Sequence, residues 1–245
     1  QGLTFQLISH KTEPVDQERM SKNLLNNYTF HQVNNPILAN MVQYQRLYQN
    51  YRSAYMQLAV TYYMDYQNEK RKKDPDEEAI LDLSEKAVMI LDQMRYNISE
   101  KIMPFNSEDL YYQVARLYGE LNRKYLMEDM LENLISMEGV SPINKVEYAN
   151  VYYRELDNSK TAISILKELY NEFIKTEKIV NNKNSLVSYP ISDWEKLEKA
   201  FPDIVSSLVY IYKEEGNKKD AKVILKDWIS RFPDDDNAKN LISNL

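Results

Sequence analysis

The sequence predicts an all-α fold, a TPR-like superhelix built from antiparallel helix pairs. Apolar residues recur at steps of three and four along most of the 245-residue chain, which is the helical period. Only four glycines occur, too few for the turns of a β-sandwich or barrel. A frame of small, aromatic and large apolar positions also recurs at close to the TPR period of about 34 residues.

Capping signals delimit the predicted helices. Asp16 is a suitable N-cap for a short helix reaching Asn26, and Asn34-Asn35-Pro36 then breaks the chain. Ser141-Pro142 combines an N-cap with proline at the first helical position. We therefore expect a junction segment over residues 1–36 and a repeat domain over 37–245. Its helix pairs are predicted near 38–96, 107–138, 142–175 and 192–232, with a terminal cap at 234–245.

The repeat frame is clearest in the last predicted pair and weaker upstream. Tyr212 and Ala221 stand nine residues apart, as do Tyr153 and Ala162. The interval from Tyr153 to Tyr212 exceeds the repeat period by about 25 residues, which predicts an insertion around residues 175–199. The residues predicted to form the repeat core are Tyr118, Tyr153, Ala162, Tyr212, Gly216, Ala221, Trp228 and Pro233.

The chain contains 20 tyrosines, and their positions suggest two different roles. One set follows steps of three and four along one face of the first long helix: Tyr44, Tyr48, Tyr51 and Tyr55. Such a stripe either contacts a sugar or peptide, or packs against neighbouring helices, and the packing interpretation is favoured. A second set, on the first helices of later pairs, is predicted to line a partner-binding groove. It consists of two tyrosines and one asparagine: Tyr111, Tyr148 and Asn150.

Composition argues against several classes of function. A net charge of −6 and a pI near 5.2 do not fit a nucleic-acid binder, whose surface is basic. There is no cysteine, and neither His10 nor His31 has a ligand-type partner one turn away, so no metal site is predicted. No phosphate-binding loop or nucleophile motif occurs, so we predict no catalytic residue and no cofactor. No apolar run approaches the length of a membrane span.

The first sixty residues carry a more particular pattern. Gly2 to Leu7 is followed by Val15-Asp16, the run Asn23 to Tyr28, and Arg46 and Arg52 ahead of Leu58-Ala59. This pattern resembles the soluble C-terminal part of a bacterial family of multi-spanning membrane proteins. The membrane half of that family is similar to protein O-mannosyltransferases. The resemblance implies a domain on the periplasmic face of the inner membrane, with any glycosyl-transfer residues in a membrane part that precedes this chain.

We therefore expect a non-catalytic protein-interaction and scaffolding domain that is a piece of a longer protein and is held at the membrane only through the preceding part. Its expected partner is a protein or peptide, with a glycan as the alternative. Two other functions remain open, a free-standing soluble TPR adaptor and an oligomerisation module. A chain without cysteine fits the cytoplasm as well as the periplasm.

Overall fold

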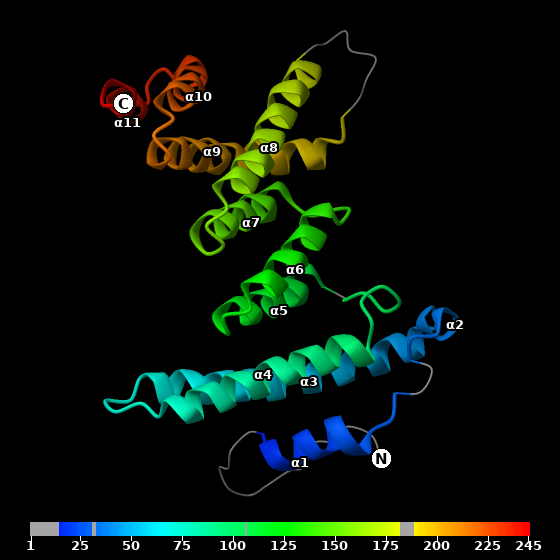
Figure 1. Cartoon of the computed structure of the whole chain (residues 1–245). Coiled ribbons are helices and arrows are strands. Elements are labelled where there is room, and N and C mark those ends of the chain that lie inside the picture. Colours follow the sequence, from blue (N-terminus) through cyan, green and yellow to red (C-terminus); the bar gives the residue numbers. More distant parts are fainter. Residues whose placement is uncertain (1–14, 31–32, 106, 182–188) are drawn as a thin grey trace, which may run out of the picture. The chain divides into compact units, whose positions relative to one another are not determined.

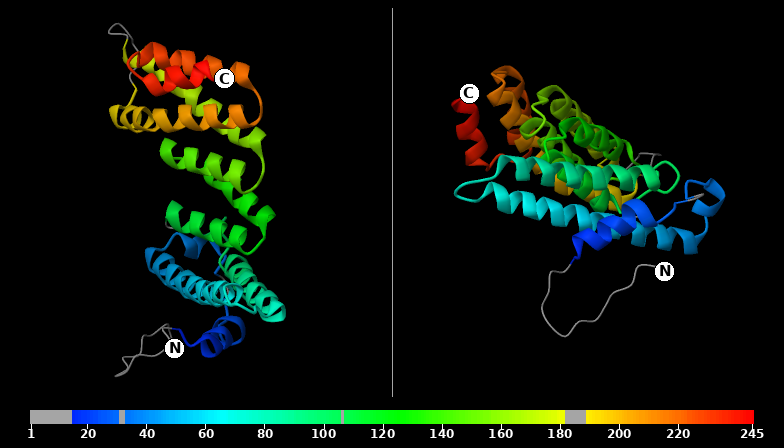
Figure 2. Two further views of the ribbon diagram at one scale, coloured as in Figure 1. Left: turned by 90° about the vertical axis from the view of Figure 1, so that its left-hand side faces the viewer. Right: turned by 60° about the horizontal axis from the view of Figure 1, so that its bottom comes forward.

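The computed structural model describes residues 15–30, 33–105, 107–181 and 189–245. Within these ranges the chain forms eleven α-helices, one π-helical turn and no strand (Figures 1 and 2). Consecutive helices pack in pairs, as in an all-α helical repeat, so the predicted fold class is confirmed. The chain divides into two compact units, Gln1–Met130 and Leu131–Leu245, and the division falls within helix α6 (Lys124–Ser136).

The first unit begins with α1 (Gln17–Lys22), which continues into the π-helical turn η1 (Asn23–Asn27). Asp16 is the N-cap, as predicted, since its carboxylate accepts a hydrogen bond from the backbone N–H of Arg19 at 3.0 Å. Two long-range hydrogen bonds hold this segment on α3 (Val42–Lys70). Gln17 donates to Asp65 at 2.6 Å, and the Tyr55 hydroxyl donates to the Leu24 carbonyl at 3.1 Å. The described part of the predicted junction segment is therefore packed on the first long helix.

The helix pair α3 and α4 (Glu77–Asn97) forms the body of the first unit. Pro36 was predicted to break the chain, and in the structure it also begins the short helix α2 (Pro36–Ala39). Asn35 caps this helix. The Asp76 carboxylate caps α4 by accepting from the N–H groups of Glu78 and Ala79. The core of the pair consists of fully buried side chains, including Tyr55, Leu58, Ala87, Ile90, Leu91 and Met94.

Three further helix pairs and a terminal helix follow. They are α5 (Glu108–Glu120) with α6, α7 (Pro142–Arg154) with α8 (Ser159–Val180), α9 (Ile191–Glu214) with α10 (Lys218–Arg231), and α11 (Asp236–Ser243). Ser107 and Ser141 cap α5 and α7 with their hydroxyls, as the sequence predicts for Ser141. The predicted pair boundaries therefore lie close to the observed ones, and the cap is α11.

The turns inside these three pairs share one geometry. In the α5–α6 turn the backbone N–H of Arg123 donates to the Tyr118 carbonyl at 2.8 Å, and the preceding Asn122 has a φ of 61°. In the α9–α10 turn the N–H of Asn217 donates to the Tyr212 carbonyl at 2.8 Å, and the preceding Gly216 has a φ of 72°. Each turn thus ends the first helix with a left-handed residue that aims the chain into the second.

The α7–α8 turn has the same geometry but is one residue longer. The N–H of Asn158 donates to the Tyr152 carbonyl at 2.9 Å, and Asp157 has a φ of 54°. Tyr152 is fully buried, whereas Tyr153 is only half-buried, with its ring edge-on to Tyr210. The core tyrosine of this pair is therefore Tyr152, and the predicted core position of Tyr153 is one residue out. Tyr118 and Tyr152 stand 34 positions apart, the repeat period itself.

The second helices carry the small residues that allow close packing. Ala162 in α8 and Ala221 in α10 are fully buried. The same position in α6 is occupied by Met127, which is also fully buried, and Gly119 faces it from α5. A Cβ on Gly119 would lie 2.4 Å from the Met127 sulfur, so the glycine makes room for the larger side chain.

The other predicted repeat-core residues of the last pair lie nearer the surface. Trp228 is half-buried, and its Nε1 donates to the Asp235 carboxylate at 2.8 Å, ahead of α11. Pro233 is exposed and directly follows Phe232, the C-cap residue of α10. Gly216 is exposed and serves through its backbone conformation rather than by packing.

The described part of the predicted insertion is helical except for Asn181, Tyr189 and Pro190. Helix α8 continues to Val180 and α9 begins at Ile191, so the extra residues lengthen both helices, while residues 182–188 lie outside the described ranges. The lengthened helices meet through stacked rings: Phe173 lies 3.6 Å from Phe201 and 5.2 Å from Trp194, measured between ring centroids. The insertion therefore enlarges the helix–helix contact of the second unit.

Candidate interaction site

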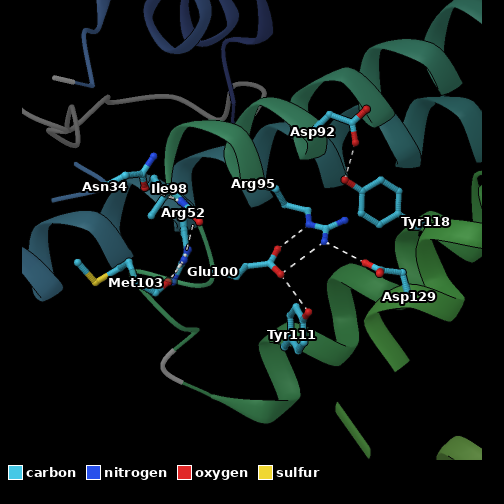
Figure 3. Close-up of polar contacts among 11 residues, drawn as sticks. Asn34, Arg52, Asp92, Arg95, Ile98, Glu100, Met103, Tyr111, Tyr118 and Asp129 are labelled. Atoms are coloured by element: carbon cyan, nitrogen blue, oxygen red, sulfur yellow. Dashed lines mark hydrogen bonds and ion pairs between the residues drawn. The ribbon is translucent and has the colours of Figure 1, made fainter. Parts of the chain in front are cut away.

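The segment from Ile98 to Phe105 has no regular helix, and Arg52 of α3 holds it in place. The Arg52 guanidinium is fully buried and donates to the carbonyls of Ile98, at 3.2 Å, and Met103 (Figure 3). It also donates to the Pro104 carbonyl at 2.7 Å. Its carbon lies 4.3 Å from the centroid of the Phe105 ring. Ile98 is the C-cap of α4, and Met103 and Pro104 lie in the loop after it, so their carbonyls have no helical hydrogen bonds of their own. The fixed fork of arginine supplies several donors at once.

Arg52 is buried without a carboxylate in direct contact among the described residues. Burial lowers the pKa of its guanidinium to about 10, and the charge of Glu100 opposes that shift. Its Nε has no hydrogen-bond partner in the described part of the chain. The positive charge is thus compensated by backbone carbonyl dipoles and an aromatic ring, which leaves a cation beneath this surface.

Glu100 is held by other groups (Figure 3). Its carboxylate pairs with Arg95 of α4 at 2.5 Å and accepts a hydrogen bond from the Tyr111 hydroxyl at 2.9 Å. Arg95 also reaches Asp129 of α6 at 3.5 Å. Burial, together with the negative charge of Glu100, raises the pKa of Tyr111 well above its usual value. This network joins the end of α4 to α5 and α6.

A neighbouring contact fixes the repeat core of the same unit. The Tyr118 hydroxyl of α5 donates to Asp92 of α4 at 2.7 Å, and Tyr118 is fully buried (Figure 3). Burial is the main cause that raises the pKa of Tyr118, and the Asp92 carboxylate adds to it. Both hydroxyls therefore serve as hydrogen-bond donors between helices.

An open groove of about 640 Å³ lies beside the segment that Arg52 holds. The first part of α3 forms one wall, with Val42, Gln45, Arg46, Gln49 and Asn50. Met103, Pro104 and Phe105 form the other, and Gln49 donates to the Pro104 carbonyl at 3.2 Å, which joins the two walls. Arg46 is exposed and makes no ion pair with any residue that the structure describes, and no lining residue is acidic.

The predicted tyrosine stripe lies in packing contacts. Tyr55 is fully buried and Tyr48 is 6% exposed. Tyr44 and Tyr51 are partly buried against a cluster formed by Val33, Tyr48, Ile98 and Met103. The stripe therefore holds the segment after η1 and the loop after α4 on α3, in agreement with the packing interpretation.

The predicted groove residues are not on an open surface. Tyr111 is 6% exposed and Tyr148 is 2% exposed, so neither ring can present a binding face in this conformation. Asn150 is half-buried on α7, in the same unit as Tyr148. The prediction of a groove lined by these two rings is therefore wrong, because both tyrosines face the inside of their helix packing.

The groove that the structure does show was missed by sequence reasoning. Gln45, Arg46 and Gln49 stand beside the tyrosine stripe at helical spacing, which is the pattern of an ordinary solvated helix face. One signal could have singled them out. Arg46 lies in a stretch from residue 36 to residue 64 that contains no acidic residue, so no partner one turn away neutralises it.

Charged and aromatic groups of the second unit form another cluster, between α8, α9 and α10. Arg231 of α10 pairs with Glu177 of α8 and with Asp227 at 3.0 Å, and Tyr170 donates to Asp227 at 2.6 Å. The Arg231 guanidinium lies 5.7 Å from the centroid of the Phe201 ring of α9. These contacts bind the lengthened α8 to the last helix pair and explain the residues without invoking a ligand.

No family model matches the chain, and no curated protein matches its sequence. Within the described ranges, no helix has both the length and the apolar character required to cross a bilayer. The same ranges hold no cluster of three or more metal-ligating side chains.

Proposed function

We propose that this chain is a non-catalytic protein-interaction and scaffolding domain of TPR type. The observation that carries the proposal is the turn shared by three helix pairs, in which a buried tyrosine carbonyl closes a left-handed turn at Tyr118, Tyr152 and Tyr212. A turn motif that recurs in successive helix pairs is typical of solenoid proteins, whose stacked pairs bind partners over extended surfaces.

The polar groups inside the pairs support the same proposal. The Arg95 and Arg231 networks and the Tyr118 hydroxyl each join two or more helices. The groove beside Arg52 differs, because the cation of Arg46 and the amide side chain of Asn50 are exposed there. This surface is available to a protein or peptide partner, and a glycan is the alternative ligand.

The resemblance of residues 2–60 supports a cellular setting for the domain. We propose that it is the periplasmic C-terminal part of a glycosyltransferase-like integral membrane protein. There it would hold an acceptor protein or a complex partner near the membrane enzyme. The transfer chemistry would belong to the preceding membrane part and not to this chain.

Cross-linking with mass spectrometry of the full-length protein in its native envelope tests the interaction role. We expect lysines of this chain to cross-link reproducibly to one or a few proteins. Cross-links that only follow protein abundance would contradict the proposal. Light scattering over a range of concentrations tests oligomerisation, because a module that only assembles copies of itself would show mass increasing with concentration and cross-links between identical chains.

The periplasmic setting has a separate test. A reporter enzyme that is active only in the periplasm, fused after Leu245 of the full-length protein, is expected to be active. A cytoplasmic result, or a reading frame without membrane spans ahead of Gln1, would instead favour the free-standing adaptor.

A further inference from the structure

We propose that the groove between the first part of α3 and residues 103–105 binds an acidic, extended peptide segment of a partner protein. This inference rests on the proposed interaction function and names the chemistry of the partner. Three features of the groove carry it: its charge, its hydrogen-bonding groups and the exposed apolar residues that precede it in the sequence.

The charge of the groove is opposite to that of the chain. The whole protein carries a net charge of −6, yet the lining residues include one arginine and no acid. Arg46 stands exposed in the groove, and the buried Arg52 contacts Pro104 and Phe105 of the opposite wall. The Glu100 carboxylate is already paired with Arg95, so these two cations give the groove a positive potential that attracts a negatively charged segment.

The hydrogen-bonding groups of the groove suit an extended backbone. Asn50 is exposed on the α3 wall, and its side chain forms no hydrogen bond with any residue that the structure describes, which leaves both a donor and an acceptor for a ligand. An extended peptide presents its N–H and C=O groups along one edge, and amide side chains can pair with either. The Arg46 guanidinium can form paired hydrogen bonds with an Asp or Glu carboxylate.

Exposed apolar residues precede the groove in the sequence, and the last of them lines it. Val42, which lines it, is 59% exposed, and it follows Met41, which is 50% exposed. Ile37 of α2 is 75% exposed, and α2 packs against α3. Exposed apolar side chains beside a polar groove are typical of interaction sites, and here they suit one apolar anchor side chain next to the acidic residues.

Two other occupants fit the groove less well. Binding to anionic lipid requires a cluster of about four to eight Lys or Arg side chains, and Arg46 is the one exposed cation among the lining residues. A sugar requires a free aromatic face, but the Phe105 ring already contacts the Arg52 guanidinium at 4.3 Å and the Tyr111 ring at 5.0 Å.

Fluorescence anisotropy with the purified chain tests the proposal. The probe is a labelled peptide of 12 residues made of Asp, Glu and Ser around a central Leu-Leu pair, and its counterpart carries Asn and Gln in place of the acids. We expect the acidic peptide to bind at least about tenfold more tightly than its counterpart at low salt. The variant Arg46→Gln should weaken binding by about threefold to tenfold, and Arg46→Glu by more.

Arg71→Glu is the matched control for Arg46→Glu. Arg71 is an exposed arginine at the other end of the same helix, about 37 Å away at 1.5 Å per residue. The Arg71→Glu substitution changes the net charge by the same amount as Arg46→Glu, and we expect it to leave the affinity for the acidic peptide unchanged. Because both side chains are exposed, circular dichroism should show all these variants folded.

Several outcomes would overturn the inference: equal binding of the two peptides, an equal loss in the Arg71→Glu variant, or Arg46-dependent binding of phosphatidylglycerol vesicles without peptide binding. The inference and the proposed function can fail separately. Partner cross-links that lie away from the groove and survive Arg46→Glu in the full-length protein would leave the interaction function standing and exclude this site. An absence of specific cross-links would contradict the function itself.

Discussion

Gly119 leaves the space that the Met127 side chain fills. We therefore predict that the effect of Gly119→Ala on the free energy of unfolding changes sign when Met127 is replaced by alanine. The Cβ of an alanine at position 119 would lie 2.4 Å from the Met127 sulfur, whereas ordinary contacts of this kind are close to about 4 Å. The Met127 atoms nearest to that Cβ belong to the flexible end of its side chain, which is fully buried and must shift to make room. Overpacking of this kind costs about 1–3 kcal/mol, while replacing glycine by alanine in a helix contributes up to about 1 kcal/mol of stability.

We therefore expect Gly119→Ala to lower the free energy of unfolding by up to about 2 kcal/mol in the natural sequence. In a Met127→Ala background the clash is absent, so the same change should raise the stability by up to about 1 kcal/mol. Met127→Ala alone should cost about 2–5 kcal/mol, because it leaves a cavity. The equivalent helices already show this combination, since Ala162 and Ala221 are each paired with a position that carries a side chain, Tyr153 and Lys213.

The double-mutant cycle can be measured by urea unfolding followed by circular dichroism. Hydrogen exchange of peptides covering residues 107–136 would report the local change, because the two compact units need not unfold together. Equal effects of Gly119→Ala in both backgrounds would refute the reasoning. They would show that position 119 requires glycine for its backbone conformation and not for the space that the Met127 side chain fills.

Three further predictions concern other positions. Arg52→Ala should destabilise the first unit by about 3–5 kcal/mol and speed amide exchange in residues 98–107, and Arg52→Lys should have an intermediate effect. Unchanged exchange would contradict the role of Arg52. Gly216→Ala should cost about 1–2 kcal/mol in thermal or urea unfolding, whereas Asp157→Gly should be neutral or stabilising, and equal costs would contradict the turn assignment. Because the folded-state pKa of Tyr118 lies above its unfolded value of 10, its stabilisation is complete below pH 10 and falls by up to about 1.4 kcal/mol per pH unit above it. Tyr118→Phe should weaken this alkaline loss of stability in urea unfolding between pH 9 and 11, and an unchanged pH slope would count against it.

The helix boundaries were predictable because their signals are local. Asp16, Asp76 and Ser141 cap helices through contacts two or three residues away, which depend on little beyond the neighbouring sequence. The position of Tyr152 was not predictable in the same way. Its turn is closed by Asp157 in a left-handed conformation, and an aspartate there gives no signal comparable to Gly216 in the last pair.

The candidate site was less predictable than the fold, because it depends on burial. Tyrosines on one face of a helix give the same sequence pattern whether that face contacts solvent or a neighbouring helix. Only the packing in the structure shows that Tyr111 and Tyr148 are buried. A fully buried arginine is also unusual, since arginine is almost never buried unless it is paired. Arg52 is accommodated by the loop after α4, and no local pattern in α3 announces that loop.

Arg52 links the stability of the fold to the proposed groove. The wall formed by Met103 and Pro104 has no helix of its own. Arg52 donates to both of its carbonyls, and Gln49 adds one hydrogen bond to the Pro104 carbonyl. Replacing Arg52 by a neutral residue such as alanine therefore removes support for the wall together with the charge, so loss of binding in such a variant would not identify the groups that contact a ligand. Arg46 differs because it lines the same groove without holding any part of the described structure, which makes it the residue at which binding can be separated from folding.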